Sequence, residues 1–310
     1  MRNSLLFVVL LLAIFASCKN NNGVEINNQE NNQEAEIVYT IPLLDSLIRV
    51  DSLNGDLFSR RAELHFDSGK YSEALFDINN AMNIKGENVQ DLLVLSDVYY
   101  MLGNFQYANA AITAAERIDS EDYTVYYAYG KHNFRVGNFE LAKLYFARSI
   151  QKHPLNPQSY FVLGQIAALE GDTANAISHY QNAIQADYEF NAAYLQLAVL
   201  NMDRNRELVP QYLQNAISVK PDNPYALFLL GVYHQDNEEY TEAKKYYLQS
   251  YPYDEKNKMT CFNLGYIYLT EELKFDSAAL WLKRALALDP NFKEAQHNYK
   301  FANELLEGEK

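Results

Sequence analysis

The sequence contains few of the residues that make turns, crosslinks or phosphate-binding sites. Its 310 residues include only 12 Gly and 8 Pro, which disfavours an all-β fold with many turns. The only two cysteines, Cys18 and Cys261, form no CxxC pair. Lys and Arg form no cluster, and the formal net charge is −14. Because phosphate binding needs a basic stripe, this composition argues against a nucleic-acid partner.

The sequence also lacks the common signatures of catalysis and of cofactor binding. It contains no GxxxxGK[ST], no GxGxxG after a strand, no HExxH and no GxSxG. The six histidines are scattered, and no two of them lie at i, i+4. We therefore expect no enzyme activity, no cofactor and no metal. His65 and His234 fall on an expected packing face, as does Cys261, so we interpret all three as core residues.

The first seventeen residues are typical of a signal peptide. Arg2 gives a positive start, and residues 5–16 form an unbroken apolar run that is too short to span a bilayer. The run ends at Phe15-Ala16-Ser17-Cys18, which resembles a bacterial lipobox, although Phe15 replaces the usual aliphatic residue. The resemblance implies that Cys18 is acylated. The alternative is an ordinary signal peptide followed by a chance cysteine.

An Asn-rich segment follows Cys18. Residues 19–36 read KNNNGVEINNQENNQEAE and contain almost nothing apolar, so we expect residues 18–38 to form an acylated, disordered tether. Asn-rich tethers of this kind resemble those of lipoproteins from the Bacteroidota.

From Gly55 onward the chain repeats about every 34 residues. The seven copies span residues 55–88, 89–122, 123–156, 157–190, 191–223, 224–257 and 258–292. In the copy 123–156 the residues that mark the period are Tyr126, Tyr129, Gly130, Gly137, Phe139, Ala142, Phe146 and Pro154. This pattern resembles the tetratricopeptide repeat (TPR), W-x2-L-G-x2-Y…A-x3-F…P.

The physics of each copy agrees with this resemblance. Apolar residues at places 4, 7, 8 and 11 of the repeat form one face of a first helix, and places 17, 20, 24 and 27 form the face of a second. Gly at place 15 suits a helix end with positive φ, and Asn104, Asn138 and Asp172 can cap the next helix. Pro154, Pro221 and Pro290 should follow the ends of second helices.

We therefore expect an all-α, right-handed α-solenoid of about seven TPR hairpins between two capping helices. Its predicted divisions are a signal peptide (1–17), the tether (18–38), an N-terminal capping helix (39–54), the repeats (55–292) and a C-terminal capping helix (293–310). In the N-terminal cap, Leu44, Leu47 and Val50 are in phase with the repeats.

The family resemblance implies a groove lined by first helices, through places 2, 5, 9, 12 and 13. Seven aromatic residues at places 5, 9 and 12 are the predicted partner groove: Tyr100, Tyr127, Phe134, Phe161, Phe228, Phe262 and Tyr266. Apolar grooves with aromatic anchors are typical of binding surfaces. The alternative is that these rings pack across neighbouring first helices. The basic clamp that family members use for chaperone C-termini is absent, because place 5 is apolar or Ser throughout.

Taken together, these features predict a lipid-anchored scaffold that binds a protein or peptide partner at the bacterial outer membrane. Lys19 follows the acylated Cys18, and the Asp that retains enterobacterial lipoproteins in the inner membrane is absent there. The alternative function is a surface-exposed lipoprotein that binds an extracellular polymer or a nutrient importer. The sequence leaves open whether the body faces the periplasm or the cell exterior.

Overall fold

The computed structural model describes residues 38–308, and these residues form helices and connecting turns without a strand. The predicted signal peptide, Cys18 and nearly all of the tether lie outside the described residues. The predicted all-α solenoid of TPR hairpins is confirmed. Among the described helices none combines the length and the apolar character needed to cross a membrane.

The described chain divides into two compact units, residues 38–132 and residues 133–308. The helices are α1 (Ile41–Val50), α2 (Gly55–Asp67), α3 (Tyr71–Lys85), α4 (Val89–Met101), α5 (Phe105–Ile118), α6 (Tyr123–Arg135), α7 (Phe139–Lys152), α8 (Pro157–Leu169), α9 (Thr173–Ala186), α10 (Asn191–Asn201), α11 (Val209–Val219), α12 (Pro224–Asp236), α13 (Tyr240–Ser250), α14 (Lys258–Thr270), α15 (Phe275–Leu288) and α16 (Lys293–Gly308). Two short 3-10 helices, η2 (Arg206–Leu208) and η3 (Tyr251–Tyr253), lie in the second unit.

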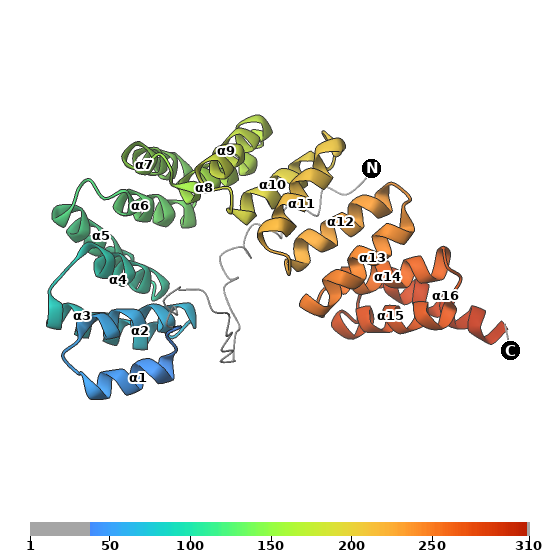
Figure 1. Cartoon of the computed structure of the whole chain (residues 1–310), viewed down its shortest axis with the longest axis horizontal. Coiled ribbons are helices and arrows are strands. Elements are labelled where there is room, and N and C mark those ends of the chain that lie inside the picture. Colours follow the sequence, from blue (N-terminus) through green and yellow to red (C-terminus); the bar gives the residue numbers. More distant parts are fainter. Residues whose placement is uncertain (1–37, 309–310) are drawn as a thin grey trace, which may run out of the picture. The chain divides into compact units, whose positions relative to one another are not determined.

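Within each unit the repeats fold as hairpins of two helices, and successive hairpins of the unit pack on one another. In the first unit α2 pairs with α3, and α4 pairs with α5 (Figure 1). In the second unit the pairs are α8 with α9, α10 with α11, α12 with α13, and α14 with α15. Because a hairpin buries its apolar face only against its neighbours, the core is a row of small clusters rather than a single centre.

Small residues let the two helices of a hairpin approach closely. The alanines at place 20 are fully buried: Ala74, Ala108, Ala142, Ala176 and Ala243. So is Ala278, which takes the equivalent position in the longer last repeat. At place 8 there is no room for a side chain where place 24 holds a large ring. A Cβ added to Gly164 would lie 2.6 Å from Cε1 of Tyr180, and one added to Gly231 would lie 2.4 Å from Cε1 of Tyr247. The close approach predicted at place 8 is therefore confirmed for these two hairpins.

The turns and caps agree with the sequence in most positions. Gly103, Gly137 and Gly171 have φ between 76° and 81°, as predicted. The side chains of Asn138 and Asp172 accept hydrogen bonds from Leu141 N–H and Asn175 N–H, but Asn104 makes no capping bond, so that prediction was wrong.

Sequence reasoning missed the caps of several first helices. The side-chain oxygens of Asn88, Asn156, Asn223 and Asn257 cap α4, α8, α12 and α14. An Asn at the last place of a repeat is the signal that could have revealed them, because Asn is a preferred N-cap residue.

Helices at both ends of the described chain pack against their neighbouring hairpins. Leu44 of α1 is fully buried, whereas Val50 is 88% exposed because it is the last residue of α1, so its predicted place in the packing face was wrong. Arg61 of α2 contacts Asp45 of α1 at 2.7 Å and Asp77 of α3 at 2.6 Å, which ties α1 to the first hairpin. At the other end α16 packs on α15 through the buried Ala295 and Ala302.

The predicted core residues behave in three different ways. Cys261 is fully buried, and burial raises the pKa of its thiol to about 11. His234 Nδ1 lies 2.5 Å from Glu239 Oε2, so it has a polar partner. His65 Nδ1 is buried without a hydrogen-bond partner, and His65 Nε2 lies 3.7 Å from Asp77 Oδ2.

Candidate functional site

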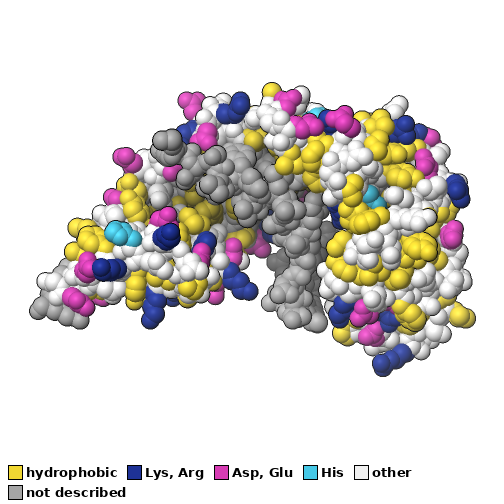
Figure 2. All heavy atoms as spheres, turned by 180° about the vertical axis from the view of Figure 1, so that it is seen from behind, with side chains coloured by type: hydrophobic (Ala, Val, Ile, Leu, Met, Phe, Trp, Pro, Cys, Tyr) yellow, Lys and Arg dark blue, Asp and Glu magenta, His cyan; other side chains and the backbone are white. Residues whose placement is uncertain are grey.

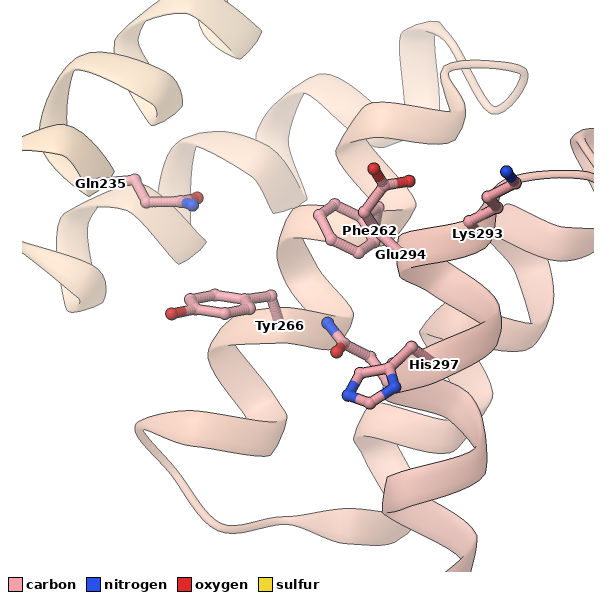
Figure 3. A pocket seen from close by; sticks show the side chains of 7 residues that line it. Gln235, Phe262, Tyr266, Lys293, Glu294 and His297 are labelled. Carbon is pink, nitrogen blue, oxygen red and sulfur yellow. The ribbon is translucent and has the colours of Figure 1, made fainter. Parts of the chain in front are cut away.

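A pocket of about 440 Å³ opens on the first-helix side of the second unit. It is lined by Gln235, Phe262, Tyr266, Lys293, Glu294, His297 and Asn298. Gln235 reaches in from α12, Phe262 and Tyr266 project from α14, and the others come from the start of α16 (Figure 3). Gln235 stands at place 12, Phe262 at place 5 and Tyr266 at place 9, all among the places expected to line a groove.

The first helices of successive repeats, α8, α10, α12 and α14 in the second unit, form what we call the first-helix row, and the start of α16 continues it. Counted from Lys293, Glu294 stands at place 2 and His297 at place 5, so α16 takes the position of a first helix in an eighth repeat. This explains why residues of a helix predicted only as a cap line the pocket beside α14. The pocket thus combines two rings, two side-chain amides, one histidine and one charge of each sign.

Of the seven predicted groove residues, the structure brings Phe262 and Tyr266 together in this pocket. Phe262 also contacts Phe292, with ring centroids 4.8 Å apart. Phe228, at place 5 of the preceding repeat, is half-buried and contacts Tyr247, with ring centroids 5.8 Å apart.

Phe161 differs from the prediction because it is only 6% exposed. Its ring contacts Tyr180 and Phe190, each at a centroid distance of 5.4 Å. Phe190 lies at the end of the same repeat and folds back over the ring. Phe161 therefore serves packing, as the alternative interpretation held, and offers little surface to a partner.

The remaining predicted rings lie in other surroundings. In the first unit the ring of Tyr100 contacts those of Phe105 and His132, at centroid distances of 5.0 Å and 4.6 Å. Tyr127 is half-buried with Lys131 Nζ 6.0 Å from its ring centroid, and Phe134 of the second unit contacts Phe139. Each of these three rings contacts a neighbouring side chain, and none of them lines the α12–α14–α16 pocket.

A chain of hydrogen bonds behind the pocket fixes the side chain of Gln235. Asn263 Nδ2 donates to Tyr247 Oη at 2.9 Å, and Tyr247 Oη donates to Gln235 Oε1 at 2.9 Å. Tyr247 is fully buried and Asn263 is 7% exposed. Burial raises the pKa of Tyr247 far above its ordinary value, so the hydroxyl keeps its proton at neutral pH.

Sequence reasoning missed this chain of bonds because its three members come from α12, α13 and α14. The only sequence signal is an uncharged amide at place 12 of repeat 224–257, where other repeats carry an apolar residue.

The first unit contains a polar cluster whose residue types resemble a catalytic triad. Ser96 Oγ lies 3.5 Å from His132 Nε2, and Asp97 Oδ1 lies 3.3 Å from the same nitrogen. A triad needs the carboxylate on Nδ1 and the hydroxyl on Nε2, so the arrangement does not match. Asp97 also contacts Lys131 Nζ at 2.5 Å, which indicates a structural ion pair between successive first helices.

A second pocket of about 380 Å³ lies in the first unit, and Arg61, His65 and Phe76 are among its lining residues. Arg61 is held by Asp45 and Asp77, so its charge is already used within the fold. Within residues 38–308, no group of three or more His, Cys, Asp or Glu side chains could hold a metal ion. On the face shown in Figure 2, basic and acidic side chains are interspersed, without a basic stripe.

Comparison with known proteins bears on the repeats. Residues 127–193 and 224–257 match sequence models described as tetratricopeptide repeat. The TPR repeat-containing protein YpiA of Bacillus subtilis is 23% identical over 276 residues, which cover 84% of this chain and 62% of YpiA. Two further curated relatives are matched over only 16% and 17% of their own lengths.

Solved structures share the fold at low sequence identity. The TPR protein YrrB, described as having an unusual peptide-binding site, superposes with a TM-score of 0.51 at 20% identity, covering 61% of this chain and 98% of YrrB. Human IFIT1, described as a dimer with m7Gppp-AAAA, superposes with a TM-score of 0.63 at 17% identity, covering 86% of this chain and 67% of IFIT1. The repeat matches and the folded hairpins together show that this chain carries tetratricopeptide repeats in an all-α solenoid.

Proposed function

We propose that this protein is a lipid-anchored scaffold at the bacterial outer membrane, and that it holds a partner protein through a peptide segment bound in the α12–α14–α16 pocket. The observation that carries the proposal is the pocket itself. It places Phe262 and Tyr266 on the first-helix row beside polar side chains from two other helices. Aromatic anchors surrounded by polar groups are typical of binding hot spots.

Two further observations support binding as the function. YrrB, which shares the fold, is described by its peptide-binding site. The Ser96, Asp97 and His132 cluster has the residue types of a catalytic triad but not its arrangement, so this cluster does not favour an enzyme. The acidic net charge favours a protein partner over a nucleic acid.

A photo-crosslinking amino acid placed at Tyr266 tests the binding site in intact cells. We expect it to capture a protein partner, because Tyr266 lies in the pocket. The matched control carries the same probe at Glu242, an exposed residue of the second helix α13 that does not line the pocket. If position 242 captures the same partner and position 266 captures none, the pocket is not the binding site.

The anchor is tested separately by the substitution Cys18→Ser. Two or three acyl chains attach a protein stably to a membrane, so the variant should accumulate as unprocessed precursor or appear in the soluble fraction. Cell fractionation and gel migration measure both. A variant that fractionates and migrates like the unaltered protein would show that Cys18 carries no lipid.

A further inference from the structure

The first-helix rows of the two units differ in charge. In the first unit, places 2, 5, 9, 12 and 13 include the charged residues Asp56, Glu63, Asp67, Asp97 and Lys131. In repeats 157–190 to 258–292 of the second unit, the same places carry only two charged residues, Asp203 and Asp236. The other residues of that row are apolar, aromatic, amide or hydroxyl side chains. Arg135, at place 13 of repeat 123–156, adds one charge to the second unit, and Lys293 and Glu294 of α16 add one of each sign at the pocket. A segment that lies along α8, α10, α12 and α14 therefore meets few charged side chains, and those in the pocket balance each other.

The half-buried apolar residues of this row lead toward the pocket. They are Leu195, Val199 and Met202 of α10 and its C-terminal end, Phe228 and Val232 of α12, and Phe262 and Tyr266 of α14. Burial of apolar area on binding stabilises a complex without any charge pairing. An extended segment with apolar side chains fits such a strip, and its main-chain groups then need hydrogen-bond partners, because an unpaired buried peptide group is costly.

Gln235 supplies such a partner at a fixed place. Its Oε1 is occupied by the hydroxyl of Tyr247, whose own oxygen is occupied by Asn263. The two N–H bonds of the Gln235 amide therefore remain available, and the amide points toward the space between the rings of α14 (Figure 3). A donor held in place by buried neighbours loses little freedom on binding, which favours affinity.

We propose that Gln235, held by Tyr247 and Asn263, donates a hydrogen bond to a main-chain carbonyl of an uncharged, extended peptide whose apolar side chain lies against Phe262 and Tyr266. This assignment rests on the proposed function, because it names the chemistry of the segment that the pocket takes. Tyr247 and Asn263 are positioning residues that act through Gln235. Gln235, Phe262 and Tyr266 touch the peptide.

The chemistry of the segment is tested by selection. A displayed library of random twelve-residue peptides is selected on the purified full chain in detergent micelles, and winners are remade with acetylated and amidated ends. We expect uncharged sequences with spaced aromatic or aliphatic residues, and affinities that change less than about twofold between low and high salt. Winners rich in charge, or winners that bind only with a free carboxylate, would overturn the assignment.

The role of Gln235 is tested with the same blocked peptides by fluorescence anisotropy. Gln235→Leu should weaken binding about five- to tenfold, the cost of one hydrogen bond and an unpaired carbonyl. Tyr247→Phe keeps the ring but removes the hydroxyl, and should weaken binding in the same direction. The control Gln249→Leu makes the first change at an exposed position of α13 and should leave affinity unchanged.

A direct readout separates positioning from a loss of fold. In the unaltered protein, the side-chain N–H signals of Gln235 in a ¹⁵N spectrum should shift when peptide is added. In Tyr247→Phe the protein should keep its helical circular dichroism but lose that shift. If peptides bind and both variants match the Gln249→Leu control, the assignment of Gln235 is wrong while the proposed function stands. If the library yields no binder, the proposed function fails too.

Discussion

At the scale of single residues, the side chain at place 8 of the first helix is small where it faces a large side chain of the second helix. In the first two hairpins Ala62 at place 8 goes with Ile78 at place 24, and Ser96 goes with Ile112. Gly164 and Gly231 instead face the rings of Tyr180 and Tyr247, and Gly265 faces Leu282. Glycine at place 8 thus makes room for a large side chain of the second helix, and its repeated occurrence reflects packing rather than flexibility.

The substitution Gly164→Leu should therefore lower the free energy of unfolding by about 1–3 kcal/mol, because overpacking forces the Tyr180 ring or the helix to shift. Urea unfolding followed by circular dichroism measures the loss. Gln158→Leu, at an exposed position of the same helix, is the control and should change stability little. Equal small effects from both substitutions would mean that α8 and α9 do not pair through Gly164.

At the scale of elements, the turns between paired helices show a local conflict in the last two repeats. Earlier hairpins place Gly69, Gly103, Gly137 or Gly171 in the left-handed region of φ. The turn after α12 places Glu238 there, with φ of 62°, and the turn after α14 places Leu273 there, with φ of 55°. For a residue other than glycine, the left-handed backbone conformation is about 1 kcal/mol less favourable than the right-handed one, so these two turns are strained.

Glu238→Gly should consequently raise the free energy of unfolding by about 0.5 kcal/mol, since relief of strain exceeds the added freedom of the unfolded chain. The reverse change, Gly171→Ala, should lower it by about 1 kcal/mol, because a Cβ there meets no atom within 4 Å and only the backbone is strained. Chemical unfolding of both variants measures the two changes in the free energy of unfolding. A loss of stability in Glu238→Gly would show that the glutamate side chain stabilises its turn.

The sequence predicts the hairpins well because a period of 34 residues fixes which places face inward in every copy. It predicts the pocket less well, since the surroundings of a ring depend on residues that the period does not specify. Phe161 and Phe262 both stand at place 5. Phe161 contacts Phe190 and is only 6% exposed, whereas Phe262 contacts Phe292 and still lines the pocket. The bond from Tyr247 to Gln235 likewise joins two helices through a single atom pair, which no period reveals.

At the scale of the whole molecule, each hairpin depends mainly on its neighbours in the chain. In repeat proteins of this kind, stability is close to a sum of hairpin and neighbour contributions. A local change in ionisation should therefore act through the hairpin that holds the group. Tyrosine is the most common aromatic residue here, with 25 copies, so alkaline pH offers a way to observe this dependence.

Tyr225 of α12 provides a defined case, because burial raises its pKa to about 12. In the unfolded chain a tyrosine has a pKa of about 10, so above that pH the unfolded state releases the proton first. The stabilisation from this group is complete below pH 10 and is lost as the pH rises toward 12, amounting to about 2–3 kcal/mol in all. Tyr180 and Tyr247, whose pKa values are also raised by burial, act in the same direction. Urea unfolding between pH 8 and 12 should show this decline, and Tyr225→Phe should decline less steeply, because it has no hydroxyl to ionise at that position. If the variant loses stability with pH as steeply as the unaltered protein, Tyr225 ionises as freely in the folded state as in the unfolded one.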